Sequence, residues 1–153
     1  MTPQEFLDKM VPAAQACHRT TGIPASFTLA QAALESGWGA RAPGCNLFGV
    51  KADKAWRGAT VDVATHEVLE GKRVAMVDKF RAYPDWAASM VDHADFFHRN
   101  PRYSKCFGEK TGEGWARAVA AAGYATDPDY ANKLISTIRA RNLVRFDVLK
   151  EAA

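Results

Sequence analysis

The chain changes character at residues 32–39, Ala32-Ala33-Leu34-Glu35-Ser36-Gly37-Trp38-Gly39. This stretch places one carboxylate, that of Glu35, at the end of an apolar segment, with Gly37 two residues later. A helix that ends here leaves its last carbonyl groups unpaired, and their dipole disfavours a nearby negative charge. Glu35 is therefore a candidate general acid, a group that donates a proton to a substrate.

Helices are predicted on both sides of this stretch. Residues 2–20 carry apolar side chains at helical spacing, and Thr2 and Glu5 can form a capping box at their start. A second helix is predicted to begin at Ser26, a good N-cap residue, and to end at Gly37. Few polar positions interrupt this second helix, so we expect it to be central.

A β-hairpin is predicted between the helical parts. Residues 60–66 and 74–81 are rich in β-branched and aromatic side chains, and Glu70-Gly71 lies between them. A two-residue turn there pairs Glu67 with Val74 and puts Glu67 at the end of a mainly apolar face. A slip of one residue in this register would move Glu67 to the other face.

Helical spacing returns after Pro84. Boundaries are predicted from Asp85, Asn100-Pro101, Gly123 and Asp127-Pro128, which are typical helix start and stop signals. The order of elements predicts one α+β domain over residues 1–153, with a β lobe at about 46–83 and an extension at about 140–153.

Composition excludes several classes of protein. The chain has 153 residues, of which 48% are hydrophobic and 24% charged, and no apolar run is long enough to span a membrane. The net charge of +3 is spread along the sequence, which argues against a nucleic-acid binder. The N-terminus lacks a basic patch followed by an apolar stretch, so we expect synthesis in the cytoplasm without a signal peptide.

The cysteines predict no metal site. Cys17, Cys45 and Cys106 are an odd number with long gaps and no CxxC pair, which argues against a zinc site and favours free thiols. The four histidines show no ligand spacing, and we expect His93 and His98 to lie on a helix surface or to pack locally.

Four sequence motifs follow one another along the chain. They are Ala30-Gln31-Ala32-Ala33-Leu34-Glu35-Ser36-Gly37-Trp38-Gly39, Asn46-Leu47-Phe48-Gly49-Val50-Lys51-Ala52, Phe80-Arg81-Ala82-Tyr83 and Ala122-Gly123-Tyr124-Ala125-Thr126-Asp127-Pro128-Asp129-Tyr130-Ala131. Together they resemble the successive motifs of the glucosaminidase family of peptidoglycan hydrolases, family 73 in the classification of sugar hydrolases. The resemblance spans residues 3–139 and is strongest to the family's flagellar members.

The resemblance implies a lysozyme-like fold and hydrolysis of the β-1,4 bond after N-acetylglucosamine in the glycan strands of peptidoglycan. It implies Glu35 as the general acid, Glu67 as a second acidic residue and Tyr124 as a third catalytic residue. No cofactor or metal is implied. We expect a monomer that acts on the cell wall after release or delivery.

Substrate contacts are expected at five further residues, each of which also has a purely structural interpretation. Trp38 is flanked by glycines and can stack on a sugar or serve as a structural wedge. Asn46 can bind an N-acetyl group or brace a turn. Phe48, Gly49 and Tyr83 are expected at the cleft, although aromatic residues in small domains are more often part of the core.

The identity of the second catalytic group stays open at this point. His66 and Glu70 are neighbours of Glu67 that could take its place if the register differs. A base role for Glu67 predicts inversion at the anomeric carbon, whereas retention would favour participation by the substrate's own acetamido group. The alternatives for the whole chain are a lytic transglycosylase or muramidase, and a cell-wall-binding module without activity.

Overall fold

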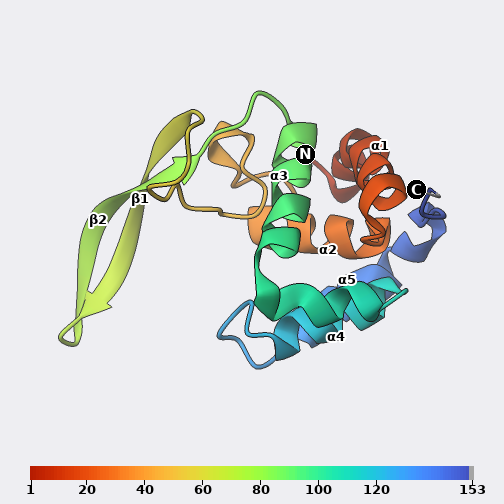
Figure 1. The fold of residues 1–153 in the computed structure, drawn as a ribbon. Coiled ribbons are helices and arrows are strands. Elements are labelled where there is room, and N and C mark those ends of the chain that lie inside the picture. Colours follow the sequence, from red (N-terminus) through yellow and green to blue (C-terminus); the bar gives the residue numbers. More distant parts are fainter. Residues whose placement is uncertain (152–153) are drawn as a thin grey trace.

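A computed structural model describes residues 1–151 of the chain. Helices make up most of it, and two strands form one antiparallel sheet (Figure 1). The α+β class is therefore confirmed. The elements are α1 (Pro3–Thr21), α2 (Ala25–Ser36), η1 (Pro43–Cys45), β1 (Thr60–Leu69), β2 (Lys72–Arg81), α3 (Trp86–Arg99), η2 (Pro101–Gly108), α4 (Gly112–Ala121), α5 (Tyr130–Ala140) and η3 (Leu143–Phe146).

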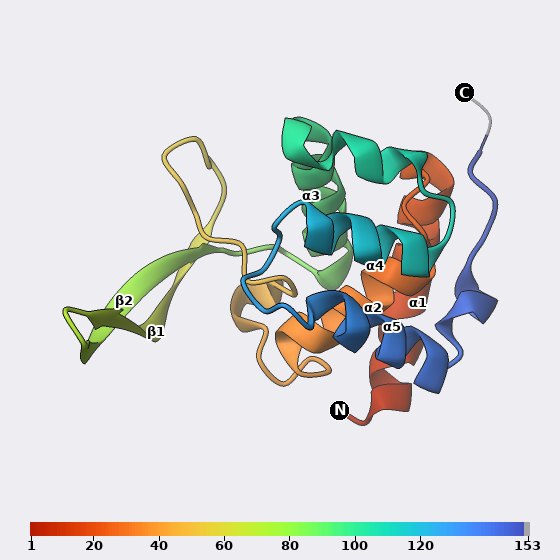
Figure 2. The same cartoon turned by 90° about the horizontal axis from the view of Figure 1, so that it is seen from below.

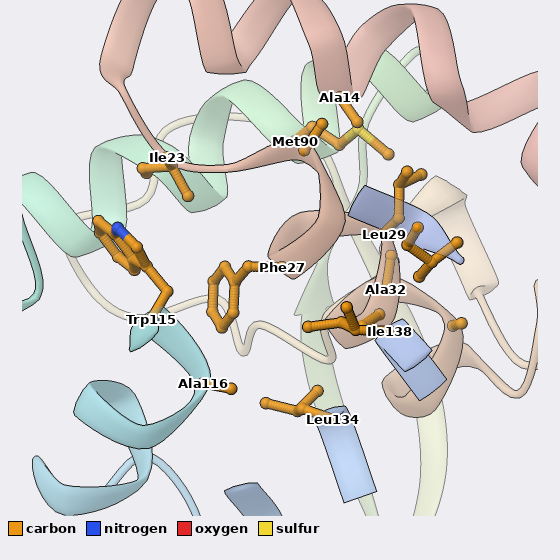
Figure 3. Packing of buried hydrophobic residues seen from close by; sticks show 14 of the residues in the cluster. Ala14, Ile23, Phe27, Leu29, Ala32, Met90, Trp115, Ala116, Leu134 and Ile138 are labelled. Atoms are coloured by element: carbon orange, nitrogen blue, oxygen red, sulfur yellow. The ribbon is translucent and has the colours of Figure 1, made fainter. Parts of the chain in front are cut away.

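Helix α2 lies at the centre of the helical part. Ten of its twelve residues are buried, because α1, α4, α5 and η3 all pack against it. In Figure 3, Phe27 of α2 faces Trp115 of α4, and Leu134 and Ile138 of α5 lie beside them. The ring centroids of Phe27 and Trp115 are 5.5 Å apart. An apolar helix that is buried all round confirms the predicted central position.

Most helix ends follow the capping signals. Thr2 and Glu5 form the predicted capping box at α1, and Gly37 ends α2 in the left-handed conformation with φ of 58°. The predicted N-cap of α2 was wrong. The N-cap is Pro24, two residues earlier, and Ser26 lies inside the helix, where its backbone N–H and hydroxyl both donate to Asp147.

The two strands form the predicted hairpin in the predicted register. Leu69 pairs with Lys72 and Glu67 with Val74, and the turn residues Glu70 and Gly71 both have positive φ, at 52° and 77°. A turn with two positive φ values matches the twist of the strands and fixes their pairing. Figures 1 and 2 show the hairpin projecting away from the helices.

The base of the hairpin is joined to the loop that precedes it. Ala52 N–H donates to the carbonyl of Lys79 at 2.9 Å, and Arg81 N–H donates to the carbonyl of Val50 at 3.0 Å. A β-bridge also joins Lys51 to Phe80. The loop and the end of β2 therefore form one continuous wall beside the helices.

The C-terminal segment packs back on the helices, as expected for a packing extension. Leu143 is fully buried, Val148 N–H donates to Nδ1 of His18, and Glu151 N–H donates to the carbonyl of Arg19. The last two residues of the predicted extension, 152 and 153, lie outside the described residues.

The three cysteines are free thiols, and Cys17 and Cys106 are buried. No helix within residues 1–151 is both long and apolar enough to cross a membrane.

Candidate active site

A cleft of about 960 Å³ lies between the helical part and the wall that carries the hairpin. Its size is within the range of ligand-binding clefts. Side chains from the end of α2, the loop before β1, the end of β2, α3, η2 and the loop before α5 line it. They are Glu35, Phe48, Gly49, Val50, Lys51, Asp53, Ala55, Trp56, Arg81, Asp92, His93, Phe96, Arg99, Asn100, Tyr103, Tyr124 and Ala125.

Glu35 is half-buried in this cleft, in the last turn of α2. The Tyr130 hydroxyl donates to its Oε1 at 2.7 Å. Burial, together with the negative charge of Glu35, raises the pKa of Tyr130, so the phenol keeps its proton at neutral pH. One carboxylate oxygen of Glu35 therefore has a fixed donor.

A buried polar chain continues from Tyr130. The side-chain amide of Gln31 donates from Nε2 to the Tyr130 hydroxyl at 3.0 Å, and its Oε1 lies 2.7 Å from Nε2 of His93. The exposed fractions of Gln31, His93 and Tyr130 are 0%, 3% and 4%. Of the two positions expected for His93, a helix surface or local packing, the structure shows the second, because its buried ring stacks on Phe48 with centroids 3.8 Å apart.

Tyr124 lines the cleft, and its ring stacks on that of Tyr130 with centroids 5.6 Å apart. Burial is the main cause of the raised pKa of Tyr124, and the nearby Tyr130 and Glu35 add to it. Within residues 1–151 its hydroxyl forms no hydrogen bond, unlike that of Tyr130. Tyr124 thus offers a neutral phenol next to the general-acid candidate.

The Asn46–Gly49 turn forms part of the cleft wall. Phe48 and Gly49 line the cleft, whereas Asn46 is 3% exposed and does not. The Asn46 amide donates to the carbonyls of Val50 and Arg81 at 2.9 Å each and accepts from Val50 N–H at 3.0 Å. The side chain of Asn46 is therefore engaged in bracing the turn.

Arg81 joins the hairpin wall to α3. Its guanidinium donates to Oδ2 of Asp92 at 2.9 Å and lies 4.6 Å from the centroid of a Trp56 ring. Tyr83 donates to the same Asp92 oxygen at 2.6 Å, and burial with this carboxylate raises the pKa of Tyr83. Tyr83 faces a second, smaller groove that shares Trp56 and Asp92 with the cleft.

Glu67 lies on the projecting hairpin and is not among the residues that line the cleft. Its Oε1 is 4.0 Å from Nζ of Lys51, which does line the cleft and also pairs with Asp78 at 3.3 Å. The carboxylates at the cleft besides Glu35 are those of Asp53 and Asp92, which sequence reasoning missed.

Trp38 lies outside the cleft lining. It follows Gly37 with a positive φ of 56°, and its ring packs edge-on against Phe6 with centroids 5.5 Å apart. The Arg141 guanidinium lies 5.3 Å from the centroid of the same ring. These contacts are those expected of a structural wedge, and sugar stacking by Trp38 stays a prediction.

Four of the site residues predicted from the sequence line the cleft. The polar chain behind Glu35 was not predicted. Glu35, Phe48, Gly49 and Tyr124 meet there. One signal could have predicted the burial of His93, since it shares helical spacing with the apolar Met90 and Phe97. Residues 1–151 contain no group of three or more His, Cys, Asp or Glu arranged to hold a metal ion.

The relatives that comparison with known proteins finds include a peptidoglycan hydrolase and a glucosaminidase. The chain is 39% identical over 143 residues to the peptidoglycan hydrolase FlgJ of Salmonella typhimurium, covering 89% of this chain and 45% of FlgJ. It is 38% identical over 152 residues to the exo-glucosaminidase LytG of Bacillus subtilis, covering 94% of this chain and 53% of LytG. This chain thus spans about half the length of these relatives.

A solved structure agrees with this result. A C-terminally truncated glycoside hydrolase domain of Salmonella typhimurium FlgJ superposes with a TM-score of 0.81 at 38% identity, covering 92% of this chain and 97% of that domain. A family model described as mannosyl-glycoprotein endo-beta-N-acetylglucosaminidase matches residues 11–143. The chain therefore belongs to the glucosaminidase family, and its fold is that of the family's lysozyme-like hydrolase domains.

Proposed function

We propose that this chain is an endo-β-N-acetylglucosaminidase that hydrolyses the β-1,4 bond after N-acetylglucosamine in bacterial peptidoglycan. The observation that carries the proposal is the position of Glu35. Its carboxyl group is half-buried at the end of α2, lines a cleft large enough for a glycan, and has a phenol bonded to one oxygen. A general acid for glycoside hydrolysis needs such a sheltered position beside the scissile bond.

In this mechanism Glu35 protonates the glycosidic oxygen as the bond to the anomeric carbon breaks. The sugar then resembles a cation, and a second group must activate water or stabilise that charge. Glu67 is the proposed second group, and its face of the hairpin continues from the cleft wall through Lys51. Tyr124 is proposed to hold the sugar or the attacking water with its unbonded hydroxyl.

The relatives support the class of substrate. One is named a peptidoglycan hydrolase and another an exo-glucosaminidase, and the matching family model is described as an endo-beta-N-acetylglucosaminidase. The proposed endo mode rests on the description of the family model. We propose that the protein works as a monomer on the cell wall after release or delivery.

Digestion of purified peptidoglycan tests the proposal. The products are reduced with borohydride, separated and identified by mass spectrometry, with Glu35→Gln as the matched inactive protein. Fragments with N-acetylglucosamine at the reduced end are expected. Reduced N-acetylmuramic acid would indicate a muramidase, an anhydro sugar would indicate a lytic transglycosylase, and binding to the sacculus without any cleavage would indicate a wall-binding module.

A further inference from the structure

The buried polar chain behind Glu35 connects three helices. His93 of α3 contacts Gln31 of α2, Gln31 contacts Tyr130 of α5, and Tyr130 contacts Glu35. All three supporting side chains are at most 4% exposed. Burying this many polar groups beside an apolar core is costly unless each is paired, so their arrangement is strongly constrained.

The hydrogen bonds of this polar chain all run in one direction, from His93 toward Glu35. Gln31 donates from Nε2 to Tyr130, so its Oε1 faces His93 and can only accept. Nε2 of His93 must therefore carry a proton. Burial lowers the pKa of His93 to about 3, so the ring is neutral and Nδ1 carries none. Consistently, Nδ1 is buried without a hydrogen-bond partner in residues 1–151.

The ring of His93 is held by aromatic neighbours. It stacks on Phe48 with centroids 3.8 Å apart and on Phe96 at 5.7 Å, and the edge of Phe97 lies at 4.6 Å. Phe48 and Phe96 also line the cleft. The nitrogen that donates to Gln31 is thus fixed in place by the same side chains that form the cleft wall.

The direction of the hydrogen bonds in this polar chain determines which carboxyl oxygen of Glu35 is free. Since Gln31 donates to the Tyr130 oxygen, the hydroxyl proton of Tyr130 points to Oε1 of Glu35. That oxygen is then occupied, and Oε2 is the oxygen left to carry the proton that is donated. A catalytic group whose orientation is fixed by a second and a third side chain is a recurring arrangement in hydrolases.

We propose that Gln31 and His93 are positioning residues for glycoside cleavage. They hold the Tyr130 hydroxyl against Oε1 of Glu35 and leave Oε2 as the oxygen that protonates the leaving group. The stacked ring of His93 lines the cleft, but its donor nitrogen faces Gln31, and neither residue is assigned a step on the sugar. The inference rests on the proposed function, because it assigns a role only if Glu35 is the acid.

Substitution of His93 tests the role by kinetics. His93→Phe keeps an aromatic ring in the stack but removes the donor to Gln31, and we expect kcat to fall about 10- to 100-fold through misorientation of the acid. KM should change less than about twofold, since the chain of side chains supports Glu35 from behind. His93→Gln, whose amide can donate from a similar position, should recover part of the loss.

A matched control separates positioning from packing. Phe97→Leu disturbs the same aromatic cluster but removes no donor or acceptor of the polar chain, and Phe97 does not line the cleft. At a temperature where both variants are folded, Phe97→Leu should keep kcat close to that of the wild type. Equal kcat in His93→Phe and wild type, or equal losses in His93→Phe and Phe97→Leu, would overturn the proposal.

A spectroscopic measurement checks the direction of the His93–Gln31 hydrogen bond without using activity. Nitrogen-15 NMR of the His93 ring should show the neutral form with its proton on Nε2, and Gln31→Met should change both ring signals. A proton on Nδ1 instead would exchange the donor and acceptor between His93 and Gln31 and overturn the inference. If the wild type cleaves glycan and His93→Phe does so equally well, only the positioning role fails; if the wild type cleaves nothing, the proposed function fails and takes this role with it.

Discussion

Asp147 caps the N-terminus of α2 from the C-terminal segment, 121 residues away from its partner Ser26. It accepts from the Ser26 backbone N–H at 2.7 Å and from the Ser26 hydroxyl at 2.8 Å. Beside it, Nδ1 of His18 accepts from the N–H of Ala25. Two of the unpaired N–H groups at the start of the central helix are therefore satisfied from outside the helix.

Removing this cap should destabilise the protein. Asp147→Ala leaves the N–H of Ser26 without its acceptor and removes a negative charge from a helix N-terminus, so we expect a loss of about 1–2 kcal/mol in the free energy of unfolding. Urea unfolding followed by circular dichroism measures it. Asp147→Asn, which keeps an acceptor but not the charge, should lose less, and an unchanged urea midpoint in Asp147→Ala would refute the capping role.

Glu35→Gln tests the general acid. The amide has almost the same shape but cannot donate the required proton, so glycan cleavage should fall by at least 10²- to 10⁴-fold while the fold is kept. Release of soluble fragments from labelled peptidoglycan is the measurement, with thermal unfolding as the check on folding. A folded Glu35→Gln protein with near-native activity would remove Glu35 from the mechanism.

The second carboxyl group is tested by comparing two positions. Glu67 is the proposed group on the hairpin, and Asp53 is a carboxylate that lines the cleft and pairs with Arg81 at 3.6 Å. We expect Glu67→Gln to lower kcat by about 10²-fold and Asp53→Asn to change it only modestly, because general base catalysis contributes on that scale. The reverse order would assign the role to Asp53.

The anomer released first tests the same group independently. If Glu67 activates water, the product should appear with inverted configuration, which proton NMR detects during the first minutes of digestion. Retained configuration would remove the base role from Glu67 and favour participation by the acetamido group of the substrate.

Tyr124→Phe tests whether the phenol takes part. The ring and its stacking on Tyr130 are preserved, and only the hydroxyl that has no partner within residues 1–151 is lost. Because a group of this kind acts on the sugar or the water, kcat should fall by about 10-fold or more with little change in stability. Unaltered turnover would return Tyr124 to a structural role.

The parts of the fold that were predictable from sequence are those fixed by local signals. Glu70-Gly71 forms a two-residue turn, which fixes the register that pairs Glu67 with Val74. Gly37 ends α2 and sets where Glu35 lies. In both cases residues a few positions apart determine the geometry, so no knowledge of tertiary packing is needed.

The features that were predicted wrongly or not at all depend on contacts between distant segments. Ser26 is a good N-cap by composition, but Asp147 takes over its capping function from the other end of the chain. The polar chain joins His93 to Gln31 across 62 positions and Tyr130 to Glu35 across 95. Such pairings arise only when α2, α3 and α5 are packed together, so no local pattern contains them.

The buried state of His93 predicts a pH dependence of stability. The pKa of His93 is about 6.5 in the unfolded chain and is lowered by burial to about 3 in the folded protein. Between these values the unfolded chain binds more protons, so the free energy of unfolding falls as the pH falls below 6.5, by up to about 1.4 kcal/mol per pH unit. The contribution is fully present above pH 6.5.

His93→Phe isolates this contribution, since phenylalanine keeps the stack but cannot bind a proton. The difference in unfolding free energy between wild type and His93→Phe should fall by about 1.5–2 kcal/mol from pH 6.5 to pH 5. Urea unfolding of both proteins at matched ionic strength measures it, and carboxyl groups common to both cancel. Parallel curves for the two proteins would mean that folding does not lower the pKa of His93, which would contradict its burial as a neutral ring next to Gln31.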